Sequence, residues 1–404
     1  MSNRSSMKAL CLLRTEGDFK PGPDVWHPVQ VEELPVPTPK AGELLLVPGS
    51  QVLVRILSAG FNHRDVFQRQ SLYPGTIFHT SASSPSILGA DAVGILISPS
   101  HPLHHKRVLI APAENWLSSP LGPDVPGQQF GILGSVKQTG GRGTFAEYIA
   151  VSEEEVIACP KHLSDDAAAA VPLGALTAYR AVFTKANVQK GDNVLITGIG
   201  GGVAILALQL CVAVGARVWV TSSSEETIKK AVELGAKGGV NYKDGPSPPA
   251  TLPSHRLPSV LLTLSLSPAS SPASWPKTFA SHLPSSRPYL DAVIDSGGGP
   301  IANQVARLIK DGGIVSCYGQ TSGKPVEIGM PFILKNAEFK GSTMGSREEF
   351  FSAIRFIGEH EIQPVVDTVL DGLENAEKGF ELMKRGGQFG KIVITVAKEE
   401  KTKL

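Results

Sequence analysis

The sequence predicts an α/β fold in which a doubly wound parallel sheet is joined to a β-rich domain. Two observations support this prediction. Between residues 193 and 318, short apolar runs alternate with segments of helical periodicity, which is typical of a parallel sheet covered by helices. Before residue 167, strand-like runs are instead separated by loops rich in proline and glycine.

The N-terminal part is predicted to be the β-rich domain. Apolar, strand-like runs cover residues 52–57, 107–110 and 145–151. Residues 111–143 are predicted to be loop, because proline and glycine recur through them. The pattern becomes helical from residue 167.

We place the second domain at residues 167–340 and expect 341–404 to return to the first domain, 1–166. The second domain alternates strands and helices, which favours a parallel sheet. Its predicted strands are 193–198, 217–222, 238–242, 290–295 and 313–318, its predicted helices are 202–214, 225–234 and 300–309, and a last strand is predicted at 391–396.

One segment interrupts the alternation. Residues 245–273 are rich in serine and proline and fall between the third and fourth predicted strands. Repeated proline cannot continue a helix or a central strand, so we expect no packed structure there. The segment is either a surface insertion or a gene-model error such as a translated intron, because a loop of this length is uncommon inside a compact domain.

The stretch 193–204 predicts a dinucleotide-binding turn. A short apolar run leads into a cluster of glycines, and an apolar helical pattern starting at Val203 follows. Glycine lets the backbone turn sharply and approach a pyrophosphate, while the helix N-terminus offers free N–H groups. A purely structural glycine turn is the alternative, and the strand and helix on either side favour the cofactor. The glycines are Gly198, Gly200, Gly201 and Gly202.

The end of the next strand suggests which cofactor binds. A dinucleotide site holds the adenosine ribose about 20 residues past the glycines, where NAD sites carry an acid. This chain has Thr221, Ser222, Ser223 and Ser224 there, whose small hydroxyls leave room for a 2′-phosphate and favour NADPH. Glu225 and Glu226 follow, and we expect them to occupy a helix first turn, where acids are favoured.

Composition excludes several classes of partner. Lys+Arg 38 against Asp+Glu 37 gives a net charge of +1, so nothing favours binding to nucleic acid or to a membrane surface. No apolar run reaches the roughly 20 residues that span a bilayer. The N-terminal residues are polar, so we expect a cytoplasmic protein. The four cysteines are scattered and predict neither disulfides nor a thiolate zinc site.

Several motifs resemble the medium-chain dehydrogenase/reductases, and in particular their zinc-independent quinone-oxidoreductase branch. The pattern Asn62, Asp65, Arg69 followed by Leu72-Tyr73-Pro74 is the most specific to the branch. With the glycine turn, the similarity extends from about Met7 to Val396, apart from 245–273. The other matching stretches are 87–94, 174–180, 233–236, 240–242, 295–299 and 387–392.

The resemblance implies a GroES-like catalytic domain and a Rossmann NADP-binding domain. It places Asn62 and Tyr73 near the nicotinamide as hydrogen-bond donors to the substrate, with Asp65 as a further candidate catalytic residue. Asp65 and Arg69 are alternatively a structural ion pair, Asn62 a turn residue, and Tyr73 a packed loop aromatic. His63 is expected to be exposed. The cofactor-binding candidates are Thr177, Gly198, Gly200, Gly201, Gly202, Val203, Ser222, Ser223, Ser224, Tyr242, Gly298, Tyr318 and Lys391.

The resemblance also tests for zinc, and the sequence lacks the ligands. Zinc members carry Cys where this chain has Asn62 and His where it has Ala90, and residues 95–143 hold none of the cysteines of a structural site. His101, His104 and His105 cluster beside Pro102, and we expect a solvated loop there. The turn ends in Ala204 where relatives usually have glycine, and Thr227 replaces a frequent lysine, which weakens the NADP prediction without reversing it.

We therefore expect a zinc-independent, NADPH-dependent reductase of quinones or α,β-unsaturated carbonyls. Hydride addition to such substrates puts negative charge on the carbonyl oxygen, which hydrogen-bond donors can stabilise. An alcohol dehydrogenase is the first alternative, and a cofactor-binding protein with little catalysis is the second. The partners expected are a small-molecule substrate and a second copy of the chain, the latter only because the resemblance implies a homodimer.

Overall fold

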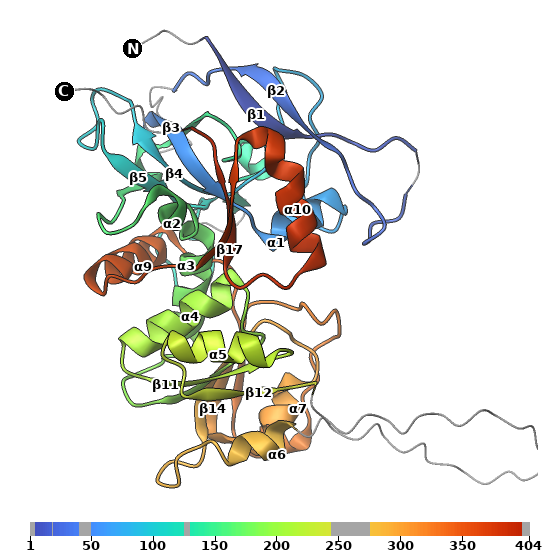
Figure 1. Ribbon diagram of the computed structural model, residues 1–404, viewed down its shortest axis with the longest axis vertical. Helices are drawn as coiled ribbons and strands as arrows, with labels where there is room; N and C mark the ends of the chain where they lie inside the picture. The colour runs from blue at the N-terminus through green and yellow to red at the C-terminus, as the bar shows by residue number, and fades with distance from the viewer. Residues whose placement is uncertain (1–4, 18, 40–49, 125–129, 244–274, 398–404) are drawn as a thin grey trace, which may run out of the picture. The chain divides into compact units, whose positions relative to one another are not determined.

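The computed structural model describes the chain except for residues 1–4, 18, 40–49, 125–129, 244–274 and 398–404. Residues 245–273, the serine- and proline-rich segment, therefore lie outside the described residues. The chain divides into two compact units. Unit 1 comprises residues 1–185, 200–210 and 342–404, and unit 2 comprises 186–199 and 211–341. Figure 1 labels many of the helices and strands and colours the chain by residue number.

Unit 1 is built mainly on antiparallel sheet, with β16 and β17 as a parallel pair. Its largest sheet has the order β16-β17-β3-β4-β5-β9, and β8 also pairs with β3. A separate pair joins β1 and β2, and a short pair joins β6 and β7. The bounds are β1 Ser6–Leu12, β2 Val29–Pro35, β3 Gln51–Gly60, β4 Asp91–Leu96, β5 Arg107–Ile110, β6 Ala113–Glu114, β7 Gly131–Ile132, β8 Tyr148–Ser152, β9 Val156–Ala158, β16 Val366–Asp371 and β17 Lys391–Thr395.

The last strand of unit 1 pairs with an early one. β17 runs antiparallel to β3, with Val393 opposite Gly60 and Thr395 opposite Ser58. The start of β17 therefore lies where β3 ends and the candidate site begins. The helices of unit 1 are α1 His63–Arg69, α2 Asp165–Ala169, α3 Pro172–Tyr179, α9 Arg347–Glu359 and α10 Ala376–Arg385.

Unit 2 contains a six-stranded parallel sheet in the order β12-β11-β10-β13-β14-β15. Numbered within the unit, this order is 3-2-1-4-5-6, which is that of a Rossmann fold. The strands are β10 Asn193–Ile196, β11 Arg217–Ser222, β12 Gly238–Asn241, β13 Leu290–Asp295, β14 Ile309–Cys317 and β15 Glu338–Gly341. The predicted α/β fold class, a doubly wound parallel sheet with a GroES-like β-rich domain, is confirmed.

The helices of unit 2 cover an apolar sheet. Its central strands β10, β11 and β13 are buried at almost every position, as is typical of parallel strands covered on both faces. A core cluster brings Trp219 of β11 against Trp275 and Phe279 of α6. Figure 1 shows α5 lying along β11 and β12. The helices are α5 Glu225–Glu233, α6 Trp275–Ala280, α7 Ile301–Val305 and α8 Met330–Ile333, and α4 Gly202–Ala213 crosses from one unit into the other.

One predicted helix and the strand after it end elsewhere. The helix expected at 300–309 stops at Val305, and β14 begins at Ile309 rather than at 313. Gly312 adopts a φ of +68°, and the pairing with β13 shifts register between Leu290 and Ala292. The strand therefore begins four residues earlier than predicted and continues through Gly312 and Gly313.

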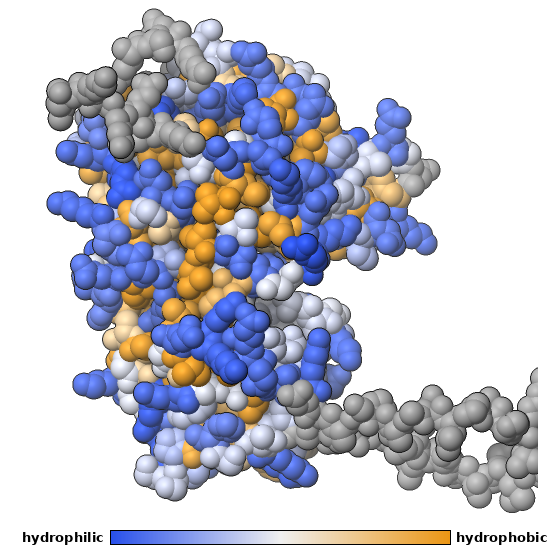
Figure 2. Space-filling view, viewed as in Figure 1, coloured by the Kyte–Doolittle hydropathy of each residue, from blue (hydrophilic) through white to orange (hydrophobic). Residues whose placement is uncertain are grey.

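The surface drawn in Figure 2 carries hydrophilic residues over most of its area, with apolar groups between them. No helix among the described residues is both long and apolar enough to cross a bilayer.

Candidate active site

The candidate site starts where β3 ends. The chain leaves β3 at Gly60, and Asn62 is the N-cap of α1 in extended conformation. The N–H of Asn62 donates to the carboxylate of Asp65 at 2.9 Å, which closes the first turn of the helix. Asn62 is 7% exposed, so its amide needs partners within the protein.

Lys391 and Asp91 supply those partners. The ammonium of Lys391 donates to Asn62 Oδ1, Asp91 Oδ2 and the carbonyl oxygen of Phe61, each at 2.7 Å. Asn62 Nδ2 in turn donates to Asp91 Oδ2 at 3.0 Å and approaches the Gly60 carbonyl at 3.5 Å. One buried ammonium thus lies among three oxygen atoms that come from the ends of β3 and β4.

Asp91 also joins this cluster to α3. Its Oδ1 accepts the backbone N–H of Leu173 at 2.7 Å, in the first turn of that helix. A carboxylate there satisfies a free N–H and interacts favourably with the helix dipole. Asp91 is fully buried, and the 2.7 Å pair with Lys391 balances its charge. Sequence reasoning missed Asp91 as a site residue, although it follows Gly89 and Ala90 in one of the matching motifs.

The expected ion pair between Asp65 and Arg69 is wrong. Arg69 turns toward α10 and pairs with Glu377 at 2.8 Å, while its Nε donates to the carbonyl of His27. Asp65 turns the other way, to the start of α1, and its nearest cation is Arg64 at 3.6 Å. The backbone N–H of Asn62 is the stronger local partner for a carboxylate at this position of a helix.

Asp65 is fully buried, and its Oδ1 accepts no hydrogen bond from the described residues. Burial raises the pKa of Asp65 to about 6, against the opposing effects of Arg64, the Asn62 N–H and Lys391. The carboxyl therefore takes up a proton just below neutral pH. Its contacts are those of a helix-capping group.

Tyr73 lies face-on against Arg64. The guanidinium carbon is 4.7 Å from the centroid of the ring. Arg64 is held by the carbonyl oxygens of Leu133 and Gly134, at 2.5 and 3.2 Å. The Tyr73 hydroxyl makes no hydrogen bond within the described part of the chain, so it is available to a ligand.

His63 is exposed, as expected, at the first position of α1. The atoms packed around the ring, and then the positive charge of Lys391, lower the pKa of His63. The imidazole is therefore neutral at neutral pH and can both accept and donate a proton.

Each glycine of the turn meets a different requirement. Gly198 and Gly200 adopt φ values of +62° and +138°, which other residues rarely reach. Gly201 is exposed, and a Cβ there would meet no described atom within 4 Å. A Cβ on Gly202 would instead lie 2.6 Å from Cδ of Lys391. Val203, in the first turn of α4, is half-buried.

These features fit a dinucleotide. Gly201 leaves the backbone open to a pyrophosphate, and α4 is a 12-residue helix whose N-terminal N–H groups follow directly. A glycine turn at the carboxyl edge of a parallel sheet is the usual place for such a ligand.

The hydroxyls after β11 divide into structural and free groups. Thr221 Oγ1 accepts the N–H of Gly198, and Ser222 Oγ accepts the N–H of Ser224, both at 3.2 Å. Ser224 is the N-cap of α5 and accepts from Thr227. Ser223 is exposed and is the hydroxyl left for a cofactor.

The two acids nearby serve the helix. Glu225 and Glu226 occupy the first turn of α5, as expected, and Glu226 pairs with Lys230 at 2.9 Å. Tyr242 is 45% exposed at the end of β12, where its N–H donates to the carbonyl of Ser222. The end of β11 is therefore followed by an exposed hydroxyl, and its two acids belong to the first turn of α5.

The remaining cofactor candidates lie in both units. In unit 2, Gly298 has a φ of +66° and donates to Asp295 at 2.7 Å, and the backbone N–H of the half-buried Tyr318 also donates to Asp295. In unit 1, Thr177 is buried on α3, with Oγ1 3.8 Å from the sulfur of Met344.

The residues do not fit a zinc ion. Zinc requires three or four Cys, His or carboxylate ligands, and no such group of three exists in the described residues. Ala90 is buried and offers no donor, while Asn62 and Asp91 already surround an ammonium. The ring centroids of His104 and His105 lie 3.7 Å apart with the planes tilted by 34°, and the described residues place no carboxylate or thiol beside the pair.

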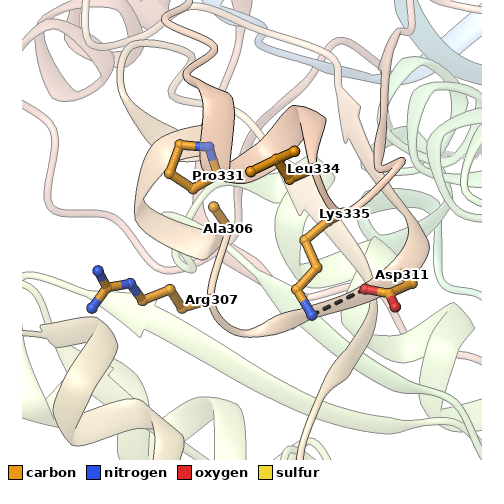
Figure 3. A pocket seen from close by; sticks show the side chains of 6 residues that line it. All are labelled: Ala306, Arg307, Asp311, Pro331, Leu334 and Lys335. Atoms are coloured by element: carbon orange, nitrogen blue, oxygen red, sulfur yellow. Dashed lines mark ion pairs between the residues drawn. The ribbon is translucent and has the colours of Figure 1, made fainter.

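Figure 3 shows a pocket of unit 2 that is a different site. It has a volume of about 410 Å³ and is lined in part by Arg307, Asp311 and Lys335, the last two 3.0 Å apart. Asp311 lies near the start of β14 and Lys335 precedes β15, so the pocket lies at the amino edge of the sheet. Dinucleotides bind at the opposite, carboxyl edge.

Two protein families match the chain. Residues 48–161 match the alcohol dehydrogenase GroES-like domain, and residues 202–359 match the zinc-binding dehydrogenases. A zinc-type alcohol dehydrogenase-like protein, YogA, of Leptosphaeria maculans is 38% identical over 93% of this chain and 96% of its own. An acryloyl-coenzyme A reductase of Metallosphaera sedula is 26% identical over 91% of this chain and 96% of its own.

Solved structures show the same fold. An NAD-dependent alcohol dehydrogenase is 30% identical, with a TM-score of 0.75, and the match covers 97% of this chain and 100% of that one. A crotonyl-CoA carboxylase/reductase in complex with NADP has a TM-score of 0.74 at 22% identity, covering 97% of this chain and 95% of the other.

Proposed function

Because the chain belongs to the medium-chain dehydrogenase/reductase superfamily of oxidoreductases, we propose that it reduces α,β-unsaturated carbonyls or quinones with NADPH and without zinc. The observation that carries this proposal is the ammonium of Lys391 between Asn62 and Asp91. Polar side chains, rather than a metal, then have to bear the charge that develops on the substrate.

When bound, the reduced nicotinamide supplies a hydride. Its acceptance by the β-carbon of an enone, or by a quinone, leaves negative charge on the carbonyl oxygen. Asn62 can donate to that oxygen from Nδ2, because one of its two hydrogens is committed only to a 3.5 Å contact with Gly60. Tyr73, whose hydroxyl has no hydrogen-bond partner among the described residues, supplies a second hydrogen bond or a proton.

The preference for NADPH is supported by Ser223. It is the exposed hydroxyl at the end of β11, where an NAD site would place an acid. Glu225 and Glu226 are taken up by the first turn of α5. Because one solved relative is an NAD-dependent alcohol dehydrogenase, the preference is tested by titrating the protein with NADPH and with NADH.

An alcohol dehydrogenase is the second candidate, favoured by the names of relatives such as the alcohol dehydrogenases of Moraxella and Geobacillus stearothermophilus. Alkoxide chemistry in the zinc enzymes depends on a metal Lewis acid, whose ligands this site lacks among the described residues. A cofactor-binding protein with little catalysis would need the glycine turn but not the cluster of Asn62, Asp91 and Lys391. Cytoplasmic location and a homodimer belong to the same proposal.

A substrate panel tests the proposal. Purified protein is mixed with NADPH and with quinones, enones, an acryloyl thioester, aldehydes and primary alcohols in turn, and the nicotinamide absorbance is followed. Turnover of enones or quinones at a rate at least about a hundredfold above that of aldehydes and alcohols is the expected result. Turnover of alcohols alone would establish the second candidate, and binding of NADPH without turnover of any substrate would establish the third.

A further inference from the structure

The ammonium of Lys391 has no hydrogen left for a cofactor phosphate. A lysine ammonium has three N–H donors. All three are used inside unit 1, by Phe61, Asn62 and Asp91, at the same distance of 2.7 Å. The side chain is 8% exposed, and its counter-charge Asp91 is fully buried. The group is therefore fixed in direction as well as in charge.

The stem of Lys391 is fixed as well. Its Cγ and Cδ lie 2.7 and 2.6 Å from where a Cβ of Gly202 would stand, so the chain passes directly over that glycine. The neighbouring Gly390 donates its N–H to the carbonyl of Gly200 at 2.9 Å. Residues 200–202 thus contact both the stem of Lys391 and the backbone of the residue before it.

We propose that Lys391 is a positioning residue of the catalytic centre, whose ammonium holds the amide of Asn62 so that one N–H of Nδ2 remains for the carbonyl oxygen of the substrate. Because Lys391 donates to Oδ1, the amide cannot rotate to exchange its oxygen and nitrogen. Asp91 then takes one hydrogen of Nδ2, and the other meets only the distant Gly60 carbonyl. That the substrate is a carbonyl compound rests on the proposed function, whereas the position of the ammonium rests on its hydrogen bonds alone.

The first test separates this role from phosphate binding. Lys391→Gln keeps most of the stem and two N–H donors but removes the charge. The expected result is a kcat at least about tenfold lower, with the Kd for NADPH, measured by fluorescence titration, within about threefold of that of the parent protein. Weakening of NADPH binding by more than tenfold, with or without loss of kcat, would show a phosphate ligand and overturn the proposal.

The second test needs no enzymatic activity. Lys391→Ala leaves three oxygen atoms facing the space of the ammonium and the stem, which a small primary ammonium can refill. Ethylammonium and propylammonium are expected to raise the melting temperature of Lys391→Ala in a saturable way, whereas ethanol and propanol do not. The matched control is Lys378→Ala, which removes an exposed lysine whose one partner among the described residues is Asn375. Equal effects of the amines on both variants would overturn the proposal.

A pair of glycine substitutions tests whether disturbing the stem of Lys391 affects catalysis or cofactor binding. Gly202→Ala places a methyl group against the stem of Lys391, whereas Gly201→Ala places one in open space on the cofactor side. Gly202→Ala is expected to lower kcat more than it weakens NADPH binding, and Gly201→Ala to do the reverse. The same pattern in both variants would contradict the assignment of the lysine.

These experiments distinguish a failure of the proposed function from a failure of the proposal for Lys391. A parent protein that reduces no quinone or enone would refute the proposed function, while the amine rescue of Lys391→Ala would still report the ammonium site. If Lys391→Ala does not fold, Lys391→Gln decides the question through NADPH affinity and through kcat on whichever substrate the panel identifies.

Discussion

Arg64 and Tyr73 form a stacked pair in which the guanidinium carbon lies 4.7 Å from the centroid of the ring. The guanidinium donates hydrogen bonds to the carbonyl oxygens of Leu133 and Gly134. The ring is thereby held at one end of α1 while its hydroxyl stays free of partners in the described structure. Because the ring makes the contact with Arg64 and the hydroxyl makes none, the hydroxyl can be removed without disturbing the packing of the ring.

Tyr73→Phe removes the hydroxyl and keeps the stacked ring. If the phenol donates to the substrate oxygen, kcat should fall by about tenfold to a thousandfold, with the melting temperature and the Kd for NADPH unchanged. Steady-state kinetics and a thermal melt measure both. Tyr148→Phe, in β8 of the same unit, is the control. Full activity in Tyr73→Phe would leave Asn62 as the sole donor.

Asp65→Asn distinguishes capping from catalysis. The amide oxygen can still accept the N–H of Asn62, so we expect activity within about threefold and a melting temperature within a few degrees of the parent. A loss of activity of a hundredfold or more in a folded variant would instead make Asp65 a catalytic group. Asp65→Ala, which leaves the N–H of Asn62 unpaired, should lower the stability in either case.

Ser223→Asp tests the cofactor preference. We expect the parent protein to bind NADPH more tightly than NADH, and the introduced carboxylate to narrow the gap by repelling the 2′-phosphate. Ser222→Ala is the companion variant, because the Ser222 hydroxyl binds a backbone N–H instead of facing solvent. Titrations in which the unaltered protein binds NADH as tightly as NADPH would reject the preference.

The metal prediction follows from Asn62 and Ala90. We expect purified protein to carry far less than one zinc per chain and to keep its activity in a chelator. Elemental analysis and a chelator series measure the two quantities. About one tightly held zinc per chain would contradict both the zinc-independent mechanism and the place of the Lys391 ammonium.

Glu155 should make the stability depend on pH. The residue is 5% exposed, its Oε2 accepts no hydrogen bond from the described residues, and burial raises its pKa from 4.5 to about 7. Arg347 opposes this shift, while Glu114 and Glu154 add to it. Between those pH values the folded protein binds more protons than the unfolded chain, so the free energy of unfolding falls as pH rises toward 7.

Glu155→Gln should remove that fall. Above pH of about 8 we expect the variant to be more stable than the parent by up to roughly 3 kcal/mol, since each unit of pKa shift is about 1.4 kcal/mol. Below about pH 4 the difference should disappear. Denaturant melts across this range measure it, with Glu153→Gln on the same turn as control. Parallel stability curves for the parent and Glu155→Gln would show that the buried carboxyl does not cause the pH dependence.

The central strands of unit 2 were predictable because they are buried on both faces. Strands β11 and β13 have the predicted bounds, and each consists of a continuous, mainly apolar run. Helix α1 was not predicted, because its buried face is formed by Arg64, Asp65 and Arg69, and charged side chains give no apolar periodicity. Strand β2 was also missed, since its side chains are mostly half-exposed and it ends at a proline.

The site was predictable only as far as local motifs reveal it. Asn62 and Lys391 could each be found from local motifs, but they are 329 residues apart, and their contact depends on the pairing of β17 with β3. Local patterns do not specify such a pairing. The motif containing Lys391 therefore suggested a cofactor-binding residue, while the geometry gives the lysine three partners in unit 1.

The pairing of β3 with β17 has a consequence for how the chain folds. β3 is translated early, and its partner strand emerges only after every residue of unit 2 has left the ribosome. Contacts so distant in sequence form slowly, because a long loop must close before they contribute any stability. Unit 2, whose sheet is complete by Gly341, can fold while unit 1 still lacks β17. We therefore expect unit 2 to resist proteolysis earlier than unit 1 during synthesis. The residues around Asn62 should be among the last to reach their native arrangement.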